Sequence, residues 1–223
     1  LGRISARRRW IVTDTLFSME GDIAPLAELC EIADRSDAGL ILDEAHALGA
    51  LGSTGRGAAE LAGVESRVPV RIATLSKAFG SLGGCVVGEQ RLIDWLWNRA
   101  RPQMFSTALP PSACAAATAA LQIAEAEPER RTRLNVRGAQ LRTGLRSMGL
   151  ATSSEIGPIV PVIVESAELV MHIAAGLESA GYLVGAIRPP TVPRNTSRLR
   201  ITLNAHHPSE AIDGLLAALA KLV

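Results

Sequence analysis

An acid and an imidazole directly follow an apolar run in the first quarter of the chain. Residues 40–42 are apolar, Asp43 comes next, and His46 stands three residues further on. Ligands of open α/β sheets bind beyond the carboxyl ends of the strands. There, an Asp can pair with a protonated ring nitrogen of a cofactor and a His can reach a neighbouring oxygen. A structural alternative stays open, in which Asp43 caps a helix and His46 is simply a hydrogen-bonded polar residue.

A lysine flanked by hydroxyl groups follows a second strand-like segment. Thr74 and Ser76 precede Lys77, and glycines follow at positions 80, 83 and 84. Burial disfavours the charged form of a lysine, which favours Schiff-base chemistry. Hydroxyl groups and glycine amides can bind a phosphate. A Ser-Lys pair alone is a weak signal, because most lysines near loops are solvated.

Apolar and polar side chains alternate strictly along residues 198–203. Alternation places them on two faces of a strand: Leu199, Ile201 and Leu203 on one, Arg198, Arg200 and Thr202 on the other. A guanidinium held on a strand is a good bidentate clamp for a carboxylate. The alternative is an edge strand with one solvated face.

The segment 14–22 links a strand to a helix and contains Ser18, which could donate a hydrogen bond to a ligand. Turn formation by itself explains Gly21 and Asp22. The order of the segments carries more information than any one of them. A Schiff-base lysine, an anion for a pyridinium nitrogen, a phosphate cradle and a distal carboxylate anchor are what a pyridoxal-phosphate (PLP) enzyme requires.

Strand and helix signals alternate along the chain, which indicates an α/β layer fold. In the first part, strands are expected at residues 10–13, 39–42, 71–74 and 86–87, and helices from about residue 25 and at 91–99 and 113–126. We expect the strands at 10–13 and 39–42 to be buried, the latter on both faces as in parallel sheets. In the second part, helices are expected at 129–148, 167–180 and 209–222, and strands at 159–164, 182–187 and 198–203. The predicted domains are residues 1–127 and a smaller α+β domain, 128–223.

Composition excludes several classes of protein. The chain has 223 residues, 48% hydrophobic and 20% charged, with a net charge of +1, so wholesale disorder is excluded. Aromatic residues make up only 3% and the arginines at positions 7–9 form no long stripe, which argues against nucleic-acid binding. Cys30, Cys85 and Cys114 lack the spacing of metal ligands, and we expect them to be buried or half-buried in a reducing, cytoplasmic compartment. No apolar stretch is long enough for a membrane helix.

The chain begins at Leu1 and enters what looks like the middle of an α/β domain. We therefore expect that an upstream portion is missing.

Five motifs together resemble the α-oxoamine synthases, which share the aspartate-aminotransferase-type PLP fold. The motifs are residues 17–22 (FSMEGD), 43–46 (DEAH), 74–80 (TLSKAFG), 105–111 (FSTALPP) and 188–193 (RPPTVP). The resemblance runs from about Trp10 to the end and is highly specific. The 188–193 segment is most similar to the biotin-pathway branch of the family. The 5-aminolevulinate synthase branch and the glycine C-acetyltransferase branch usually carry a Tyr-Pro variant there.

The resemblance implies a fold and a cofactor. The fold would be a partial large domain with a mainly parallel sheet, followed by the small domain. Lys77 would bind PLP covalently and later move the Cα proton, while Asp43 would pair with the pyridinium nitrogen. His46 would bond the ring oxygen, and Ser18 would also contact the cofactor. Thr74 would hold the phosphate, with Ser76 as a weaker candidate.

The resemblance also implies partners. Ser106 and Thr107 would approach the phosphate of a partner subunit, because these enzymes are homodimers with shared sites. Arg200 is the first choice for the amino-acid carboxylate and Arg188 the competing one, while Thr191 would line the substrate pocket. The implied reaction condenses L-alanine with a pimeloyl thioester of coenzyme A or an acyl carrier protein, with loss of carbon dioxide.

Two departures and two alternatives accompany this resemblance. Asp14 stands where the family usually has Glu, so a contact made from that site would be weakened. The upstream part that normally supplies an aromatic group, usually a His, against the PLP ring is absent from the sequence. The alternatives are a related synthase that uses glycine, an inactive truncated fragment of such an enzyme, and a non-catalytic subunit, although Lys77 counts against the last of these.

Overall fold

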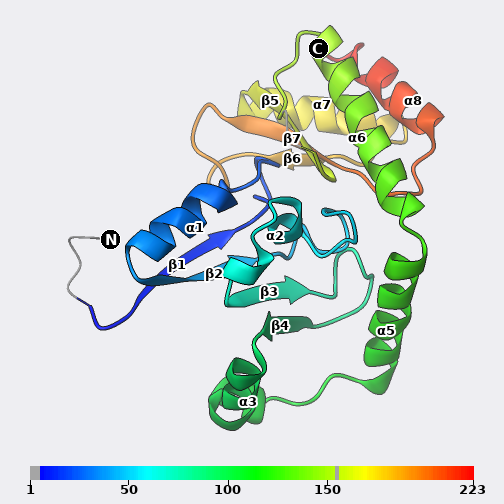
Figure 1. The fold of residues 1–223 in the computed structure, drawn as a ribbon. Coiled ribbons are helices and arrows are strands. Elements are labelled where there is room, and N and C mark those ends of the chain that lie inside the picture. Colours follow the sequence, from blue (N-terminus) through cyan, green and yellow to red (C-terminus); the bar gives the residue numbers. More distant parts are fainter. Residues whose placement is uncertain (1–5, 154–155) are drawn as a thin grey trace. The chain divides into compact units, whose positions relative to one another are not determined.

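The computed structural model describes residues 6–153 and 156–223, and the chain divides into two compact units. The first unit runs to Leu16 and continues from Ile23 to Pro128. The second unit consists of Phe17–Asp22 and Glu129–Val223. Figure 1 labels the strands and most of the helices of both units.

A four-stranded sheet forms the centre of the first unit. Its strands are β1 (Arg9–Asp14), β2 (Ala38–Asp43), β3 (Val70–Thr74) and β4 (Gly84–Gly88), in that spatial order. The first three are mutually parallel and β4 is antiparallel to β3, which confirms the mainly parallel α/β sheet. Since parallel strands share a direction, β1, β2 and β3 present their carboxyl ends at one edge.

Helices complete the first unit (Figure 1). They are α1 (Leu26–Arg35), α2 (Ala58–Leu61), the 3₁₀ helix η1 (Glu65–Arg67), α3 (Gln90–Arg99), α4 (Arg101–Met104) and α5 (Pro111–Ala126). Helix α1 packs on β1 and β2 through its buried residues Leu26, Cys30 and Ala33. Helices α2, η1 and α4 were not predicted from the sequence, because they are too short to show helical periodicity.

The two faces of this sheet differ sharply in exposure. Leu40 and Leu42 of β2 are buried, whereas on the opposite face Trp10 is 48% and Val12 67% exposed. The prediction that residues 10–13 and 39–42 are fully buried is therefore wrong for one face. The physical reason is that α1 packs on β1 and β2 from one side only; on the other side the Trp10 ring lies over Gly39, where a β-carbon would meet it at 2.4 Å.

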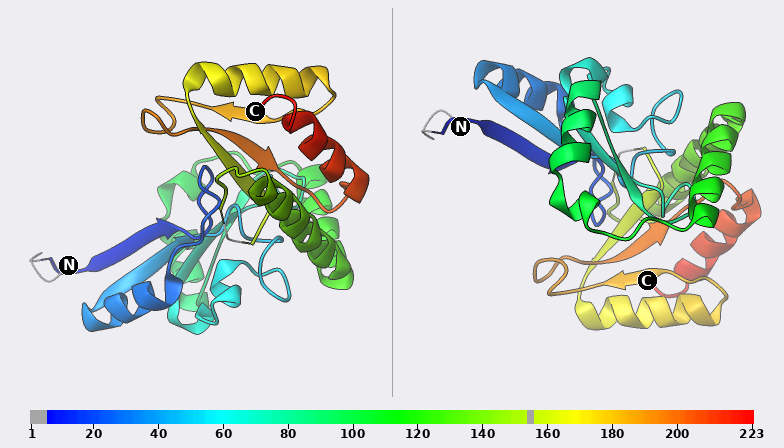
Figure 2. Two further views of the ribbon diagram at one scale, coloured as in Figure 1. Left: turned by 90° about the horizontal axis from the view of Figure 1, so that it is seen from above. Right: turned by 90° about the horizontal axis from the view of Figure 1, so that it is seen from below.

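In its described residues, the second unit combines a small antiparallel sheet with the helices α6, α7 and α8 (Figure 2). Its elements are α6 (Glu129–Ser147), β5 (Ile159–Glu165), α7 (Ala167–Ser179), β6 (Gly185–Ile187), β7 (Ser197–Thr202) and α8 (Ser209–Leu219). The sheet order is β5-β7-β6, so β7 is the central strand. The alternative of an edge strand at 198–203 is therefore wrong. Strand β6 is shorter than the predicted 182–187, and Leu183 before it is 88% exposed.

The segment Phe17–Asp22 groups with the second unit, whereas the sequence analysis placed it within a domain of residues 1–127. Hydrogen bonds from Arg198 and Arg200 of β7 to this segment account for the difference. Sequence proximity to β1 gave no indication of these contacts, because they bridge about 180 residues of chain.

None of the helices in residues 6–153 and 156–223 is long and apolar enough to cross a membrane. Within these same ranges no cluster of His, Cys, Asp and Glu could hold a metal ion. Cys30 is buried and Cys85 half-buried, but Cys114 is exposed, contrary to expectation, because α5 buries only Ala117.

Candidate functional site

The predicted acid lies at the carboxyl end of β2, as expected. Asp43 is the last residue of the strand, and its Oδ1 accepts a hydrogen bond of 2.8 Å from the Ala45 amide. The segment after it forms turns rather than a helix, so the helix-cap alternative is not observed. Asp43 is paired in register with Ile72 and therefore shares a sheet face with Ile72 and Thr74.

The predicted lysine and histidine meet in the first unit. Nζ of Lys77 lies 2.9 Å from Nε2 of His46. Both residues follow strand ends, His46 three residues after β2 and Lys77 three residues after β3. An amine at hydrogen-bond distance from an imidazole can exchange a proton with it or be oriented by it.

A glycine allows the two loops to approach each other. Gly49 has a φ of +81°, and a β-carbon at this position would lie 2.7 Å from Cβ of Ala78 and 3.3 Å from the ring of Phe79. Phe79 is itself buried. The loop after β2 therefore packs directly on the loop that carries Lys77, and this packing brings His46 to the amine.

The residue after Asp43, Glu44, has a buried carboxylate that was not predicted from the sequence. Glu44 is 1% exposed, and its side chain accepts hydrogen bonds from Thr15 Oγ1 and from the amides of Ala58 and Ala59. It thereby holds the start of α2 to the end of β2. The only signal in the sequence was a second acid next to Asp43, which does not distinguish a buried position from a solvated one.

The hydroxyl groups that were predicted to bind phosphate lie together. Thr74 Oγ1 is 2.7 Å from Ser76 Oγ, and it also accepts from the Ser76 amide and is 3.1 Å from the Gly83 carbonyl. The pair precedes Lys77 directly. Hydroxyl groups and an amide clustered at a strand end provide donors of the kind that phosphate oxygens accept.

Residues 105–111 belong to the same unit, and Ser106 and Thr107 are exposed. The Leu109 side chain packs against Gly83, where a β-carbon would approach it to 2.5 Å, and Ser81 Oγ donates to the Ala113 carbonyl at 2.7 Å. These contacts attach the segment to the loop that follows Lys77. The exposure of Ser106 and Thr107 is compatible with the prediction that they serve a partner subunit, which stays a prediction.

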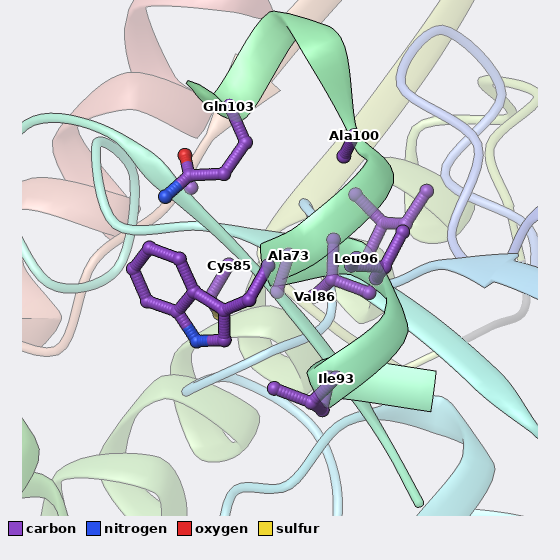
Figure 3. A pocket seen from close by; sticks show the side chains of 10 residues that line it. Ala73, Cys85, Val86, Ile93, Leu96, Ala100 and Gln103 are labelled. Carbon is purple, nitrogen blue, oxygen red and sulfur yellow. The ribbon is translucent and has the colours of Figure 1, made fainter. Parts of the chain in front are cut away.

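The first unit also contains an apolar hollow of about 470 Å³ between α3 and the strands β3 and β4 (Figure 3). The lining residues are Ile72, Ala73, Gly84, Cys85, Val86, Ile93, Leu96, Trp97, Ala100 and Gln103. None of the predicted site residues is among them. The residues grouped around Lys77 thus do not line the hollow, although Ile72, which does, lies beside Asp43 in register.

The remaining predicted residues belong to the second unit. Arg200 is half-buried, and its Nε donates a 2.5 Å hydrogen bond to the Ser18 carbonyl. Burial lowers the pKa of the Arg200 guanidinium from its usual value. The structure thus brings Ser18 and Arg200 together, as two residues of one group.

Arg188 and Thr191 are exposed, in the loop between β6 and β7. The Thr191 amide donates to the Arg188 carbonyl at 3.1 Å, which closes a turn. Arg188 is thus less enclosed than Arg200. Arg198, which sequence reasoning did not choose, is 5% exposed and forms an ion pair with Glu20.

The chain is similar to several known proteins and solved structures. It is 51% identical over all 223 residues to an 8-amino-7-oxononanoate synthase from Anaeromyxobacter dehalogenans, and covers 56% of that protein. A serine palmitoyltransferase from S. paucimobilis, solved with bound PLP and myriocin, matches 99% of the chain with a TM-score of 0.94 and 32% identity; the match covers 56% of that protein. The 8-amino-7-oxononanoate synthase of Francisella tularensis matches 96% of the chain with a TM-score of 0.85 and 28% identity, over 62% of its own length.

The chain therefore spans little more than half the length of the curated relatives it matches. Aminotransferase-type structures match nearly all of it, which confirms the predicted fold class. The family model of aminotransferase classes I and II matches residues 2–219, and the chain belongs to this family.

Proposed function

We propose that this chain carries the PLP-binding lysine of an acyltransferase that condenses L-alanine with a pimeloyl thioester to 8-amino-7-oxononanoate. The observation that carries the proposal is the 2.9 Å contact between Lys77 and His46, beside a strand-end Asp43. The high identity to the Anaeromyxobacter enzyme over the whole chain supports the choice of reaction.

The residues of the first unit fit PLP in their chemistry. A carboxylate, an imidazole, an amine and a pair of hydroxyls follow the ends of two neighbouring parallel strands. These match the pyridinium nitrogen, the ring oxygen, the aldehyde and the phosphate of the cofactor, respectively. When bound, PLP withdraws electrons from the Cα atom of an amino acid joined to it.

Each side chain has a distinct task in this proposal. Lys77 binds the cofactor through Nζ and moves the proton at the Cα atom of the substrate. His46 bonds the ring oxygen of the cofactor, and its Nε2, which lies beside Nζ, also orients the amine. Asp43 uses Oδ1 for the Ala45 amide, which fixes the carboxylate so that Oδ2 can pair with the pyridinium nitrogen. Ser18 adds a contact to the cofactor.

The amino-acid carboxylate is assigned to Arg200. Its guanidinium is half-buried and, among the described residues, binds one backbone carbonyl, so that it keeps donors for a carboxylate. Arg188 is exposed and is the second choice, with Thr191 as a residue of the substrate pocket. The acyl thioester would come from coenzyme A or an acyl carrier protein.

The active protein is proposed to be a homodimer. Ser106 and Thr107 are exposed on the segment that leads into α5, from where they would serve the phosphate of a partner subunit. Helix α5 is alanine-rich and exposed along most of its length, with Ala117 as its buried residue. This exposure supports the proposal that another part of the assembled protein covers the helix.

The test uses the full-length protein incubated with PLP, reduced with borohydride and digested. Labelling at Lys77 is expected, and labelling elsewhere or nowhere would refute the cofactor assignment. Product formation from pimeloyl-coenzyme A is then compared for alanine, glycine and serine. Turnover with alanine alone supports the proposed reaction, whereas turnover with glycine favours the related synthase.

A further inference from the structure

Two arginines project from the same face of β7 but differ in their exposure and in their hydrogen bonds. Arg198 and Arg200 are two residues apart on the central strand of the small sheet. Arg198 is 5% exposed, whereas Arg200 is half-buried. Both reach the segment Phe17–Asp22, which we call the turn segment.

Two nitrogens of the Arg198 guanidinium, Nε and Nη1, donate within the protein. Its Nη1 lies 3.0 Å from Oε1 of Glu20 and 3.3 Å from the Met19 carbonyl, and its Nε donates to the Thr196 carbonyl at 3.0 Å. Because Glu20 already supplies a carboxylate, Arg198 is not the arginine that would bind the carboxylate of a substrate.

Arg200 is held by one contact. Its Nε donates to the Ser18 carbonyl, and in the described part of the chain neither Nη1 nor Nη2 has a protein partner. A guanidinium anchored through Nε keeps the two parallel N–H groups of its outer end, which suit a bidentate carboxylate.

The turn segment is itself tightly closed. The Phe17 amide donates to the Asp22 carbonyl at 3.0 Å, and the Gly21 amide donates to the Phe17 carbonyl at 2.9 Å. Gly21 has a φ of +65°, and a β-carbon there would lie 2.6 Å from the Ile159 carbonyl oxygen. The segment therefore presses against β5 while the arginines of β7 bind its carbonyl groups.

We propose that Glu20 and Arg198 are positioning residues, whose ion pair holds the turn segment on β7 so that the Ser18 carbonyl orients Arg200 toward the amino-acid carboxylate. This inference rests on the proposed function, since it presupposes that Arg200 binds that carboxylate. Glu20 also compensates the charge of Arg198, so that one net positive charge remains on this face for a substrate anion.

The test measures how the PLP-loaded, full-length protein discriminates L-alanine from ethylamine, which has the same amine but no carboxylate. Both are titrated while the cofactor absorbance is followed, for the unaltered protein and for Glu20→Gln, Glu20→Asp and Arg198→Met. We expect Glu20→Gln and Arg198→Met to lower the preference for alanine at least about tenfold, as small displacements of a positioned group do. Glu20→Asp should restore part of the preference, and the KM for the acyl thioester should stay unchanged.

A second readout needs no cofactor. Amide hydrogen exchange at Phe17 and Gly21 should accelerate in Glu20→Gln, because the segment loses its attachment to Arg198. Glu168→Gln is the matched control, as Glu168 is an exposed acid that also accepts a side-chain hydrogen bond, from Ser166. It should change neither the preference for alanine nor the exchange of the turn segment.

The outcomes separate the inference from the function on which it rests. If Arg200→Gln abolishes the preference for alanine but Glu20→Gln and Arg198→Met retain it, the positioning role is wrong and the carboxylate site stands. If Arg200→Gln also retains the preference, the assignment of Arg200 is wrong and the inference falls with it. Equal weakening of alanine and ethylamine in the Glu20 and Arg198 variants would show a merely structural role and would also overturn the inference.

Discussion

Nζ of Lys77 lies 2.9 Å from Nε2 of His46, although 31 residues separate them in the sequence. The contact depends on two loops that follow neighbouring parallel strands and pack on each other at Gly49. An amine in this position can be oriented and can exchange a proton at a substrate atom, which is the basis of the first prediction.

Replacing Lys77 by Ala should abolish the borohydride-trappable adduct with PLP in the full-length protein. Product formation should fall by at least about 10²-fold, because both the covalent attachment and the proton transfer are lost. Absorbance spectra and a product assay measure the two effects. Lys221→Ala, at the end of the second unit, is the control and should behave as the unaltered protein does.

Replacing Asp43 by Asn removes the charge that is proposed to pair with the pyridinium nitrogen. The dissociation constant of PLP should rise about 10- to 100-fold, the usual effect of losing a charge-assisted hydrogen bond. Equilibrium dialysis against PLP measures the change. In Asp34→Asn, where an exposed ion pair with Arg67 is lost instead, PLP affinity should not change; equal affinities in all three proteins would contradict the role of Asp43.

Replacing Glu44 by Ala should lower the free energy of unfolding by about 3 kcal/mol or more. The reason is that a buried hydroxyl and two buried amides lose their acceptor, at about 1–3 kcal/mol each. Urea denaturation measures the loss. The exposed Glu31→Ala provides the comparison, for which a change within about 0.5 kcal/mol is expected.

Glu60 should make the stability of the chain depend on pH in the acid range. Burial raises its pKa, but hydrogen bonds from the Thr54 amide and hydroxyl, the Ser53 hydroxyl and the Arg56 amide outweigh burial and bring the pKa from 4.5 to about 2. Since the pKa is depressed in the folded state, the stabilisation is fully present above about pH 4.5 and is lost as the pH falls toward 2.

The measurement for Glu60 is urea denaturation between pH 2 and 6, for the unaltered chain and for Glu60→Gln. The difference in unfolding free energy between the unaltered chain and Glu60→Gln should be constant at the upper end of this pH range and should shrink toward its lower end. A difference that does not vary with pH would contradict the depressed pKa.

The exposed face of the four-stranded sheet should bind an apolar dye in the 223-residue chain. Trp10, Val12, Ile72 and Val86 lie on that face and are exposed. Val12→Lys should reduce the dye fluorescence while changing the unfolding free energy by no more than about 0.5 kcal/mol. Leu183→Lys, on a single exposed leucine of the second unit, should leave the fluorescence as it was.

The sequence alone determined the kinds and the order of the longer elements. Apolar periodicity over residues 26–33 and alternation over 198–203 are local, and the structure has a helix and a strand there. The strand-end positions of Asp43 and Lys77 followed in the same way, because a strand and the turn after it have a recognisable composition.

Only the tertiary structure decided which of these residues meet. The Lys77–His46 contact, the burial of Glu44 and the attachment of the turn segment to β7 all join residues far apart in the chain. Such contacts depend on strand register and on glycines that allow close approach, as at Gly49 and Gly21. A local pattern carries no information about what packs against it, which is why the exposure of Val12 and the ion pair of Arg198 with Glu20 could not be predicted from the sequence.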